Sequence, residues 1–488
     1  MRLDDDLKYF EQPDFKKILA EYEAAREVGI PLYMDAEDLT DIAEYYALVA
    51  EDETSSQEVL EFALQLHPDA VDPQIFRARQ FMLKGDADKA WELCEAIEDQ
   101  SHREVCFLRA ELLIRANKAK EAFSLLFFLI DTIDEDRDFF IYDSAYIFID
   151  YREFEWAVVF SNKLEEMSPD WYKTWQLQAD VALGLEQFRT ALSFIERMLD
   201  VDPFDVESWN WRAEAYSSLE EYDKAVESTD YALAIEPDNE RALQLKAWVL
   251  MQQGNTVEAN KLYDRLIGTN PDCEQHWLYK SYCTLDAGDA HEALALIKRA
   301  EELAGDVSVD QQAIHEQYAQ VLSRLGDMEG ALLQLDMAEA LRDPNLGWDE
   351  RMLRVRVHAE NEDPIGAIIE AQRQLEMYKD VYMKVYYQCA LILFEYGYFE
   401  QAYYFFNDIS SSEAARKVSE QPLEVYSYMA YIDMEQGNDE RALENLRKAV
   451  DALDPHLSEL FEDKFPGVLP NELYDYYYNK VYGRWPED

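Results

Sequence analysis

The sequence is poor in the two residues that most often interrupt helices. Its 488 residues include only 15 glycines and 15 prolines, about 3% each, against averages of roughly 7% and 5%. No β-hairpin signature accompanies them, whereas the helix-forming residues alanine, leucine and glutamate are abundant. The composition therefore predicts a chain that is helical nearly throughout.

Positive charge is also scarce. The chain carries 45 lysines and arginines against 102 aspartates and glutamates, a net charge of −57. Nucleic-acid binding needs cations that displace phosphate counterions, and an anionic membrane surface needs them equally. We therefore expect neither partner. Because 48% of the residues are hydrophobic, the charge belongs on the surface of a folded protein rather than on a disordered chain.

Cysteine and targeting signals give a prediction about the compartment. The five cysteines are odd in number and none forms a CxxC pair, so reduced thiols are expected rather than disulfides or zinc sites. The N-terminal MRLDDDLKYF lacks the basic and apolar regions of a signal peptide, and no apolar run is long enough to span a bilayer. These features predict a cytoplasmic protein.

An internal repeat of 34 residues dominates the middle of the chain. The stretch that starts at Val206 and ends at Pro237 has counterparts one period earlier and one period later. The recurring positions are Trp175, Ala179, Ala182, Phe188, Ala191, Ile195 and Pro203; Trp209, Ala213, Tyr216, Tyr222, Ala225, Ala232 and Pro237; and Leu243, Ala247, Leu250, Gly254, Ala259, Tyr263 and Pro271. Each period predicts two helices, A and B, and such units bury their faces only by stacking.

Two small residues mark each unit and extend the pattern to about twelve units. In helix A they are Ala43, Ala78, Ala110, Ala145, Ala179, Ala213, Ala247, Ser281, Ala319, Ala390 and Ala430, with Val355 as the exception. In helix B they are Ser56, Ala90, Ala122, Ala157, Ala191, Ala225, Ala259, Ala293, Ala331, Ala367, Ala402 and Ala442. Small residues are expected where the two helices approach most closely.

This pattern resembles the tetratricopeptide repeat family, which has the same 34-residue period. The resemblance implies an all-α fold, a right-handed superhelical solenoid of antiparallel helix pairs. We expect an N-terminal capping helix within residues 1–35, the repeats at 36–455 and an aromatic-rich capping segment at 456–488. The capping helix is expected over Asp14–Val28, whose apolar residues share one side and which Gly29 ends. Longer connections at Gly305–Asp310 and Ser410–Gln421 interrupt the regular spacing. The C-terminal segment has the alternative of docking elsewhere.

Enzyme motifs are missing from the sequence: GxGxxG, GxxxxGK[ST], GxSxG and HExxH do not occur. Asp134, Asp136 and Asp138 start like a calcium loop, but Phe139 and Ala145 stand where that loop needs glycine and glutamate. We therefore predict no enzyme activity, no catalytic residues, no cofactor and no metal site.

The remaining candidate is the concave face, which the resemblance assigns to helix A of each unit. The expected partner-binding residues are Arg79, Phe107, Tyr142, Tyr146, Lys173, Arg241, Trp248, Tyr282, Arg356, Tyr387 and Tyr431. The first hypothesis is a non-enzymatic scaffold that binds a peptide or helix of another protein in this groove. The alternative is a superhelical receptor for a small ligand or signalling peptide. The sequence does not identify the partner, and it leaves the oligomeric state open.

Overall fold

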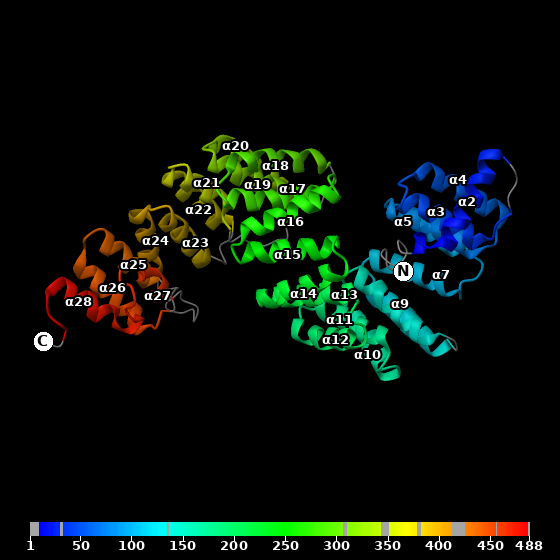
Figure 1. Ribbon diagram of the computed structural model, residues 1–488, viewed down its shortest axis with the longest axis horizontal. Helices are drawn as coiled ribbons and strands as arrows, with labels where there is room; N and C mark the ends of the chain where they lie inside the picture. The colour runs from blue at the N-terminus through cyan, green and yellow to red at the C-terminus, as the bar shows by residue number, and fades with distance from the viewer. Residues whose placement is uncertain are drawn as a thin grey trace. The chain divides into compact units, whose positions relative to one another are not determined.

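The computed structural model describes residues 9–29, 33–133, 136–305, 310–342, 351–377, 382–411, 425–454 and 456–486. These residues form helices, and no strand occurs among them (Figure 1). The chain divides into two compact units, residues 1–245 and 246–488, and each unit is described separately.

The first unit contains one leading helix followed by a series of helix pairs. Its helices are α2 (Pro13–Val28), α3 (Ala36–Leu48), α4 (Glu53–Leu66), α5 (Val71–Leu83), α6 (Ala87–Ala96), α7 (Arg103–Arg115), α8 (Ala119–Leu129), η1 (Ile130–Thr132), α9 (Arg137–Asp150), α10 (Phe154–Met167), α11 (Tyr172–Gly184), α12 (Phe188–Val201), α13 (Val206–Ser218) and α14 (Tyr222–Ile235). Helix α15 (Glu240–Gln252) contains the boundary between the units.

The second unit continues the same order. Its helices are α16 (Thr256–Thr269), α17 (Glu274–Asp286), α18 (Ala290–Leu303), α19 (Gln311–Arg324), α20 (Met328–Leu341), α21 (Leu353–Glu360), α22 (Pro364–Met377), α23 (Tyr382–Glu395), α24 (Phe399–Ser411), α25 (Val425–Glu435), α26 (Asp439–Asp451), α27 (Leu457–Phe461), η3 (Pro470–Glu472) and α28 (Leu473–Tyr482). Over the described residues, α3 to α26 therefore follow one another in the A/B order of the repeat, and the all-α solenoid that the repeat predicts is confirmed.

The small residues of the repeat occupy its most buried positions. All eleven alanines predicted for helix B have an exposed fraction of 0%, as do all ten alanines predicted for helix A. Two repeats have serine at one of these positions, and the hydrogen bonds of the serines show which helix the position contacts. The Ser56 hydroxyl of α4 donates to the Ala43 carbonyl of α3 at 2.7 Å, and the Ser281 hydroxyl of α17 donates to the Ala293 carbonyl of α18 at 3.3 Å. The two helices of a repeat thus contact each other at their small residues.

In several repeats, the turn between helix A and helix B consists of a glycine followed by the N-cap residue of helix B. Gly288 has a φ of 92°, which side-chain-bearing residues rarely adopt. The Asp289 carboxylate next to it accepts a hydrogen bond from the Glu292 backbone N–H at 3.0 Å, and so caps α18. Glutamate takes the glycine's place at Glu186 and Glu220, with φ near 60° in both. The turn geometry is therefore kept even where glycine is lost.

Tryptophans spaced by 34 residues, or by a multiple of 34, hold the turn between one repeat and the next. The indole N–H groups of α11, α13 and α17 each donate to a proline carbonyl six residues earlier. The pairs are Trp175 to Pro169 at 2.7 Å, Trp209 to Pro203 at 2.9 Å and Trp277 to Pro271 at 2.9 Å. The carbonyl of the proline that ends helix B is the acceptor of this hydrogen bond. Tryptophan and proline therefore recur together, six residues apart.

Both ends of the chain add helices to the outermost repeats. Helix α2 buries Phe15 and Tyr22 against α3 and α4, and it ends at Gly29 with a φ of 68°. The predicted helix over Asp14–Val28 is thus confirmed. In the second unit, α27 and α28 bury Phe461 and Tyr477 against α26. The boundaries at 35 and 455 stay predictions, and most of the two long connections lies outside the described residues.

Asp41 of α3 is a partly buried carboxylate that lies against Tyr9, near the N-terminus. The Tyr9 hydroxyl donates to Asp41 Oδ2 at 2.6 Å. Burial raises the pKa of Asp41 to about 6, with Glu37, Asp38 and Asp72 adding repulsion, although the Tyr9 hydrogen bond opposes the shift. The folded state therefore holds this proton more tightly than the unfolded state, and stability falls as the pH rises from about 4 to about 6.

We expect Asp41→Asn to stabilise α3 at pH 7.5, because asparagine keeps an acceptor for Tyr9 without a buried charge. The gain should be about 1–2 kcal/mol after allowance for partial solvent exposure, and it should shrink at pH 5. Hydrogen exchange of the α3 amides in both proteins at both pH values measures it. A variant that is less stable than the wild type at pH 7.5 would contradict this account.

Candidate partner-binding surface

Every residue predicted for the groove lies on the first helix of a pair. The positions are Arg79 in α5, Phe107 in α7, Tyr142 and Tyr146 in α9, Lys173 in α11, Arg241 and Trp248 in α15, Tyr282 in α17, Arg356 in α21, Tyr387 in α23, and Tyr431 in α25. Their side chains fall into three classes: buried aromatic residues, paired cations and half-buried aromatic residues.

Three of the predicted aromatic residues are core residues of the first unit. Phe107, Tyr142 and Tyr146 expose only 4%, 6% and 6% of their surface. The Phe107 ring stacks on Phe140 at 5.2 Å, and the Tyr142 hydroxyl donates to Gln176 Oε1 at 2.9 Å. The prediction that these three offer surface to a partner does not fit this structure. The reason is that Phe107 of α7 packs on α9, and that α9 is itself buried on nearly all sides between α7, α10 and α11.

The predicted cations are engaged within the chain. Arg79 bonds Glu111 of α7 at 2.8 Å, and Arg241 bonds Glu214 of α13 at 2.7 Å. Arg356 bonds Glu395 of α23, also at 2.8 Å. Each of these pairs joins the first helices of two successive repeats. In the sequence, the signal of this pairing is an acidic residue about one repeat away from each arginine.

Lys173 is held differently, by aromatic rings. Its Nζ lies 4.6 Å from the centre of the Tyr142 ring and 5.5 Å from that of Phe139. Such contacts contribute about 0.5–1 kcal/mol at exposed sites. The four predicted cations thus connect neighbouring repeats, and partner-binding cations are not what the structure assigns to them.

The half-buried aromatic residues belong to α15 and the second unit. Trp248, Tyr282, Tyr387 and Tyr431 all keep part of their surface open. Trp248, Tyr282 and Tyr431 each directly follow the buried small residue of their helix, Ala247, Ser281 or Ala430, so they hold the same place in three repeats. Large aromatic side chains with an open edge are typical of protein interfaces.

Two of these tyrosines have polar neighbours. Burial, with added repulsion from Glu316, raises the pKa of Tyr282, so that its hydroxyl stays protonated as a hydrogen-bond donor. The Lys464 ammonium lies 4.3 Å from the centre of the Tyr431 ring. Both rings therefore have a charged residue of the same chain close to them.

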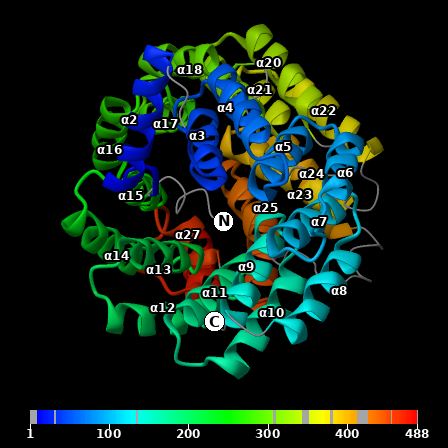
Figure 2. The same cartoon turned by 90° about the vertical axis from the view of Figure 1, so that its right-hand side faces the viewer.

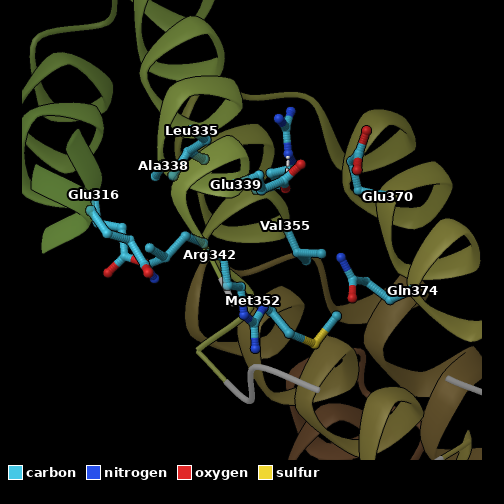
Figure 3. A pocket seen from close by; sticks show the side chains of 12 residues that line it. Glu316, Leu335, Ala338, Glu339, Arg342, Met352, Val355, Glu370 and Gln374 are labelled. Carbon is cyan, nitrogen blue, oxygen red and sulfur yellow. Dashed lines mark hydrogen bonds and ion pairs between the residues drawn. The ribbon is translucent and has the colours of Figure 1, made fainter. Parts of the chain in front are cut away.

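A polar cavity of about 60 Å³ lies among α19, α20, α21 and α22 (Figure 3). At its α19 side, Glu316 accepts two hydrogen bonds from Arg351, at 2.6 and 3.1 Å. Arg354 donates to Glu339 of α20 at 2.6 Å and also to Asp336. The cavity is far below the roughly 300–1,000 Å³ of typical small-ligand sites, so its charged residues serve chiefly to join three helices.

Known protein families match the middle of the chain. Two family models described as tetratricopeptide repeat match residues 177–240 and 220–280. No curated protein matches the chain. None of the described helices is both long and apolar enough to cross a membrane.

Solved structures resemble parts or all of the chain at low identity. MamA 41-end from Desulfovibrio magneticus RS-1 is 16% identical, with 35% of this chain and 95% of that chain covered and a TM-score of 0.32. A tetratricopeptide repeat protein from Parabacteroides merdae ATCC 43184 is 15% identical, with 59% and 97% covered and a TM-score of 0.38. The APC/C hetero-tetramer Cut9–Hcn1 is 12% identical, with 96% and 97% covered and a TM-score of 0.36. Since all three TM-scores are below 0.5, nothing about partners passes from these proteins to this chain.

Proposed function

Because this chain is a tetratricopeptide repeat protein, we propose that it is a non-enzymatic scaffold that binds a peptide or helix of another protein along its first helices. Proteins of this family serve as protein-interaction scaffolds. The finer part of the proposal, the binding surface, rests on the positions of particular side chains in this chain.

One observation carries the proposal. Trp248, Tyr282 and Tyr431 hold the same place in three repeats, directly after a buried small residue, and all keep part of their surface exposed. A helix or peptide that runs across successive first helices would meet Trp248 and Tyr282 in turn, whereas Tyr431 lies four repeats further along the chain. Truncating a central aromatic residue of an interface typically costs about 2 kcal/mol or more of binding free energy. Trp248 and Tyr282, on consecutive first helices, are the candidate anchors.

The expected partner segment is basic or neutral. The net charge of −57 repels acidic chains, and the arginines of this face are already paired with Glu111, Glu214 and Glu395. An acidic segment would therefore have to compete for cations that hold the repeats together. Complementary charge speeds association and disfavours wrong partners, which also argues against nucleic acid and anionic membranes as partners.

The compartment proposed is the cytoplasm, where thiols are kept reduced. All five cysteines are free, and four of them are buried. Burial raises the pKa of the Cys283 and Cys389 thiols to about 12, which keeps them protonated and unreactive. The alternative function, a receptor that closes on a small ligand, lacks a specific observation in its favour. Neither Trp248 nor Tyr282 lines the small cavity of Figure 3 or the two larger open hollows of about 280 and 610 Å³.

The test is a titration with a captured partner. The intact chain is used to isolate binding proteins from an extract of its source, and one purified partner is then titrated against variants. Trp248→Ala and Tyr282→Ala should each weaken binding about 30-fold, the equivalent of about 2 kcal/mol. Tyr231→Ala, which removes a 48% exposed ring from the second helix α14, is the matched control and should bind like the wild type.

Melting curves of the same variants separate binding from folding. We expect small shifts for Trp248→Ala and Tyr282→Ala, because both side chains are only half-buried. If both variants melt much earlier and bind unchanged once folded, the two rings are core residues and the proposed surface is wrong.

A further inference from the structure

The second helix of each repeat has one position that faces outward throughout the chain. It lies two residues after the buried small residue of that helix. In seven repeats this position is polar and exposed: Glu58, Glu92, Ser124, Ser193, Glu227, Lys261 and Glu444. Two further repeats have small apolar residues there, the half-buried Val159 and the exposed Ala295. Polar residues at this position are expected on an outer surface that contacts solvent.

Three successive repeats of the second unit depart from this rule. At the same position α20, α22 and α24 carry Leu333, Ile369 and Tyr404, with exposed fractions of 61%, 58% and 66%. Further large apolar side chains accompany them on α20 and α22. Together they form what we call the outer patch: Leu333, Met337, Leu341, Ile365, Ile369, Met377 and Tyr404, all at least 43% exposed. Scattered apolar residues are ordinary on a surface, but a group of this kind marks an interaction site.

The helices that carry the outer patch are neighbours. Helices α20 and α22 both wall the polar cavity of Figure 3 and both pack against α21, and Figure 2 shows the three helices in one region of the second unit. Between α22, α23 and α24 lies an open hollow of about 280 Å³, lined by Ile368, Gln372, Glu400 and Tyr404 among others. The hollow is large enough for the side chains of a docked helix, and its wall combines apolar surface with a carboxylate.

The charge around the outer patch is acidic. Of the exposed charged residues described on α20, α22 and α24, one is basic, Arg373, and five are acidic: Glu329, Asp336, Glu339, Glu376 and Glu400. Arg354 neutralises part of this charge through Asp336 and Glu339, and Arg373 lies 3.6 Å from Glu370. A second copy of this chain would bring another −57 charges to the same surface, so self-association is disfavoured.

We propose that the outer patch docks a basic amphipathic helix of a partner protein. The apolar face of that helix, with anchors spaced i, i+3, i+4 and i+7, would cover Leu333, Ile369 and Tyr404. Its lysines or arginines would lie at the edges, next to Glu329, Glu376 and Glu400. This surface is formed by second helices, whereas the proposed scaffold function uses first helices, so the two sites would hold two different segments.

The test uses a defined probe, an 18-residue peptide of leucine and lysine with all leucines on one helical face. Fluorescence anisotropy with the full chain should detect binding. A variant with Leu333→Ser, Ile369→Ser and Tyr404→Ser should bind at least about tenfold more weakly. The matched control has Val201→Ser and Val257→Ser, which remove exposed apolar side chains from α12 and α16, and it should bind like the wild type.

Two further peptides separate shape from charge. A scrambled leucine–lysine peptide, whose leucines do not share a face, and a leucine–glutamate peptide of the original pattern should both bind more weakly than the probe. Equal binding of the scrambled peptide, absence of probe binding, or unchanged affinity of the triple variant would each overturn the proposal. So would a concentration-dependent dimer of the wild type that the triple variant loses, because a second copy would then cover the patch.

Discussion

Replacing Phe160 by alanine should destabilise its part of the first unit by about 3–5 kcal/mol, the range typical of emptied aromatic core positions. The Phe160 side chain of α10 is fully buried. Its ring lies 5.6 Å from Phe148 of α9 and 5.4 Å from Phe123 of α8. The ring thus fills the space between two repeats, and the backbone cannot collapse far enough to close the cavity that its removal leaves.

Hydrogen exchange by segment measures this loss and its extent. Because each repeat contacts mainly its neighbours, the amides of α8, α9 and α10 should exchange much faster, whereas those of α3 and α4 should change little. Phe128→Ala is the matched control, since Phe128 of α8 is 75% exposed, and its effect should stay within about 0.5 kcal/mol. Faster exchange spread evenly over the whole unit would contradict the nearest-neighbour picture.

The second large effect is expected from enlarging a small residue. Ala225 of α14 has an exposed fraction of 0% and occupies the place where the two helices of a unit meet. Ala225→Leu adds three carbon atoms at this contact, and overpacking of this kind costs about 1–3 kcal/mol. Exchange should accelerate in α13 and α14. Ala234→Leu, at an exposed position of the same helix, is the control. Equal effects of the two substitutions would mean that Ala225 does not lie at a close helix contact.

The sequence predicts the repeat so fully because the repeat's constraints are local. The small residues, the turn glycines and the prolines act within one unit or between two adjacent units. Ala225 can therefore be assigned from spacing alone, and the structure has it fully buried as predicted. The helix Asp14–Val28 follows for the same reason, since its apolar face and the terminal Gly29 are signals within the segment itself.

The candidate surface was less predictable, because exposure depends on packing between helices. Tyr142 and Tyr282 both lie on first helices, yet Tyr142 is buried and Tyr282 keeps part of its surface exposed. The difference lies in α9, where Phe140, Ile141 and Phe148 bury further faces of the helix, and one residue's position in the repeat does not reveal that. Likewise, Arg356 could be named as a cation, but its pairing with Glu395 becomes visible only when α21 and α23 are placed side by side.

The central claim, that a partner binds along the first helices, is tested most directly by hydroxyl-radical footprinting of the complex with a captured partner. Oxidation reports the solvent exposure of single aromatic side chains, which makes Trp248 and Tyr282 their own probes. We expect both to be oxidised more slowly in the complex, while the exposed Tyr231 of α14 reacts at its free rate. Unchanged oxidation of Trp248 and Tyr282 in a saturated complex would contradict the claim.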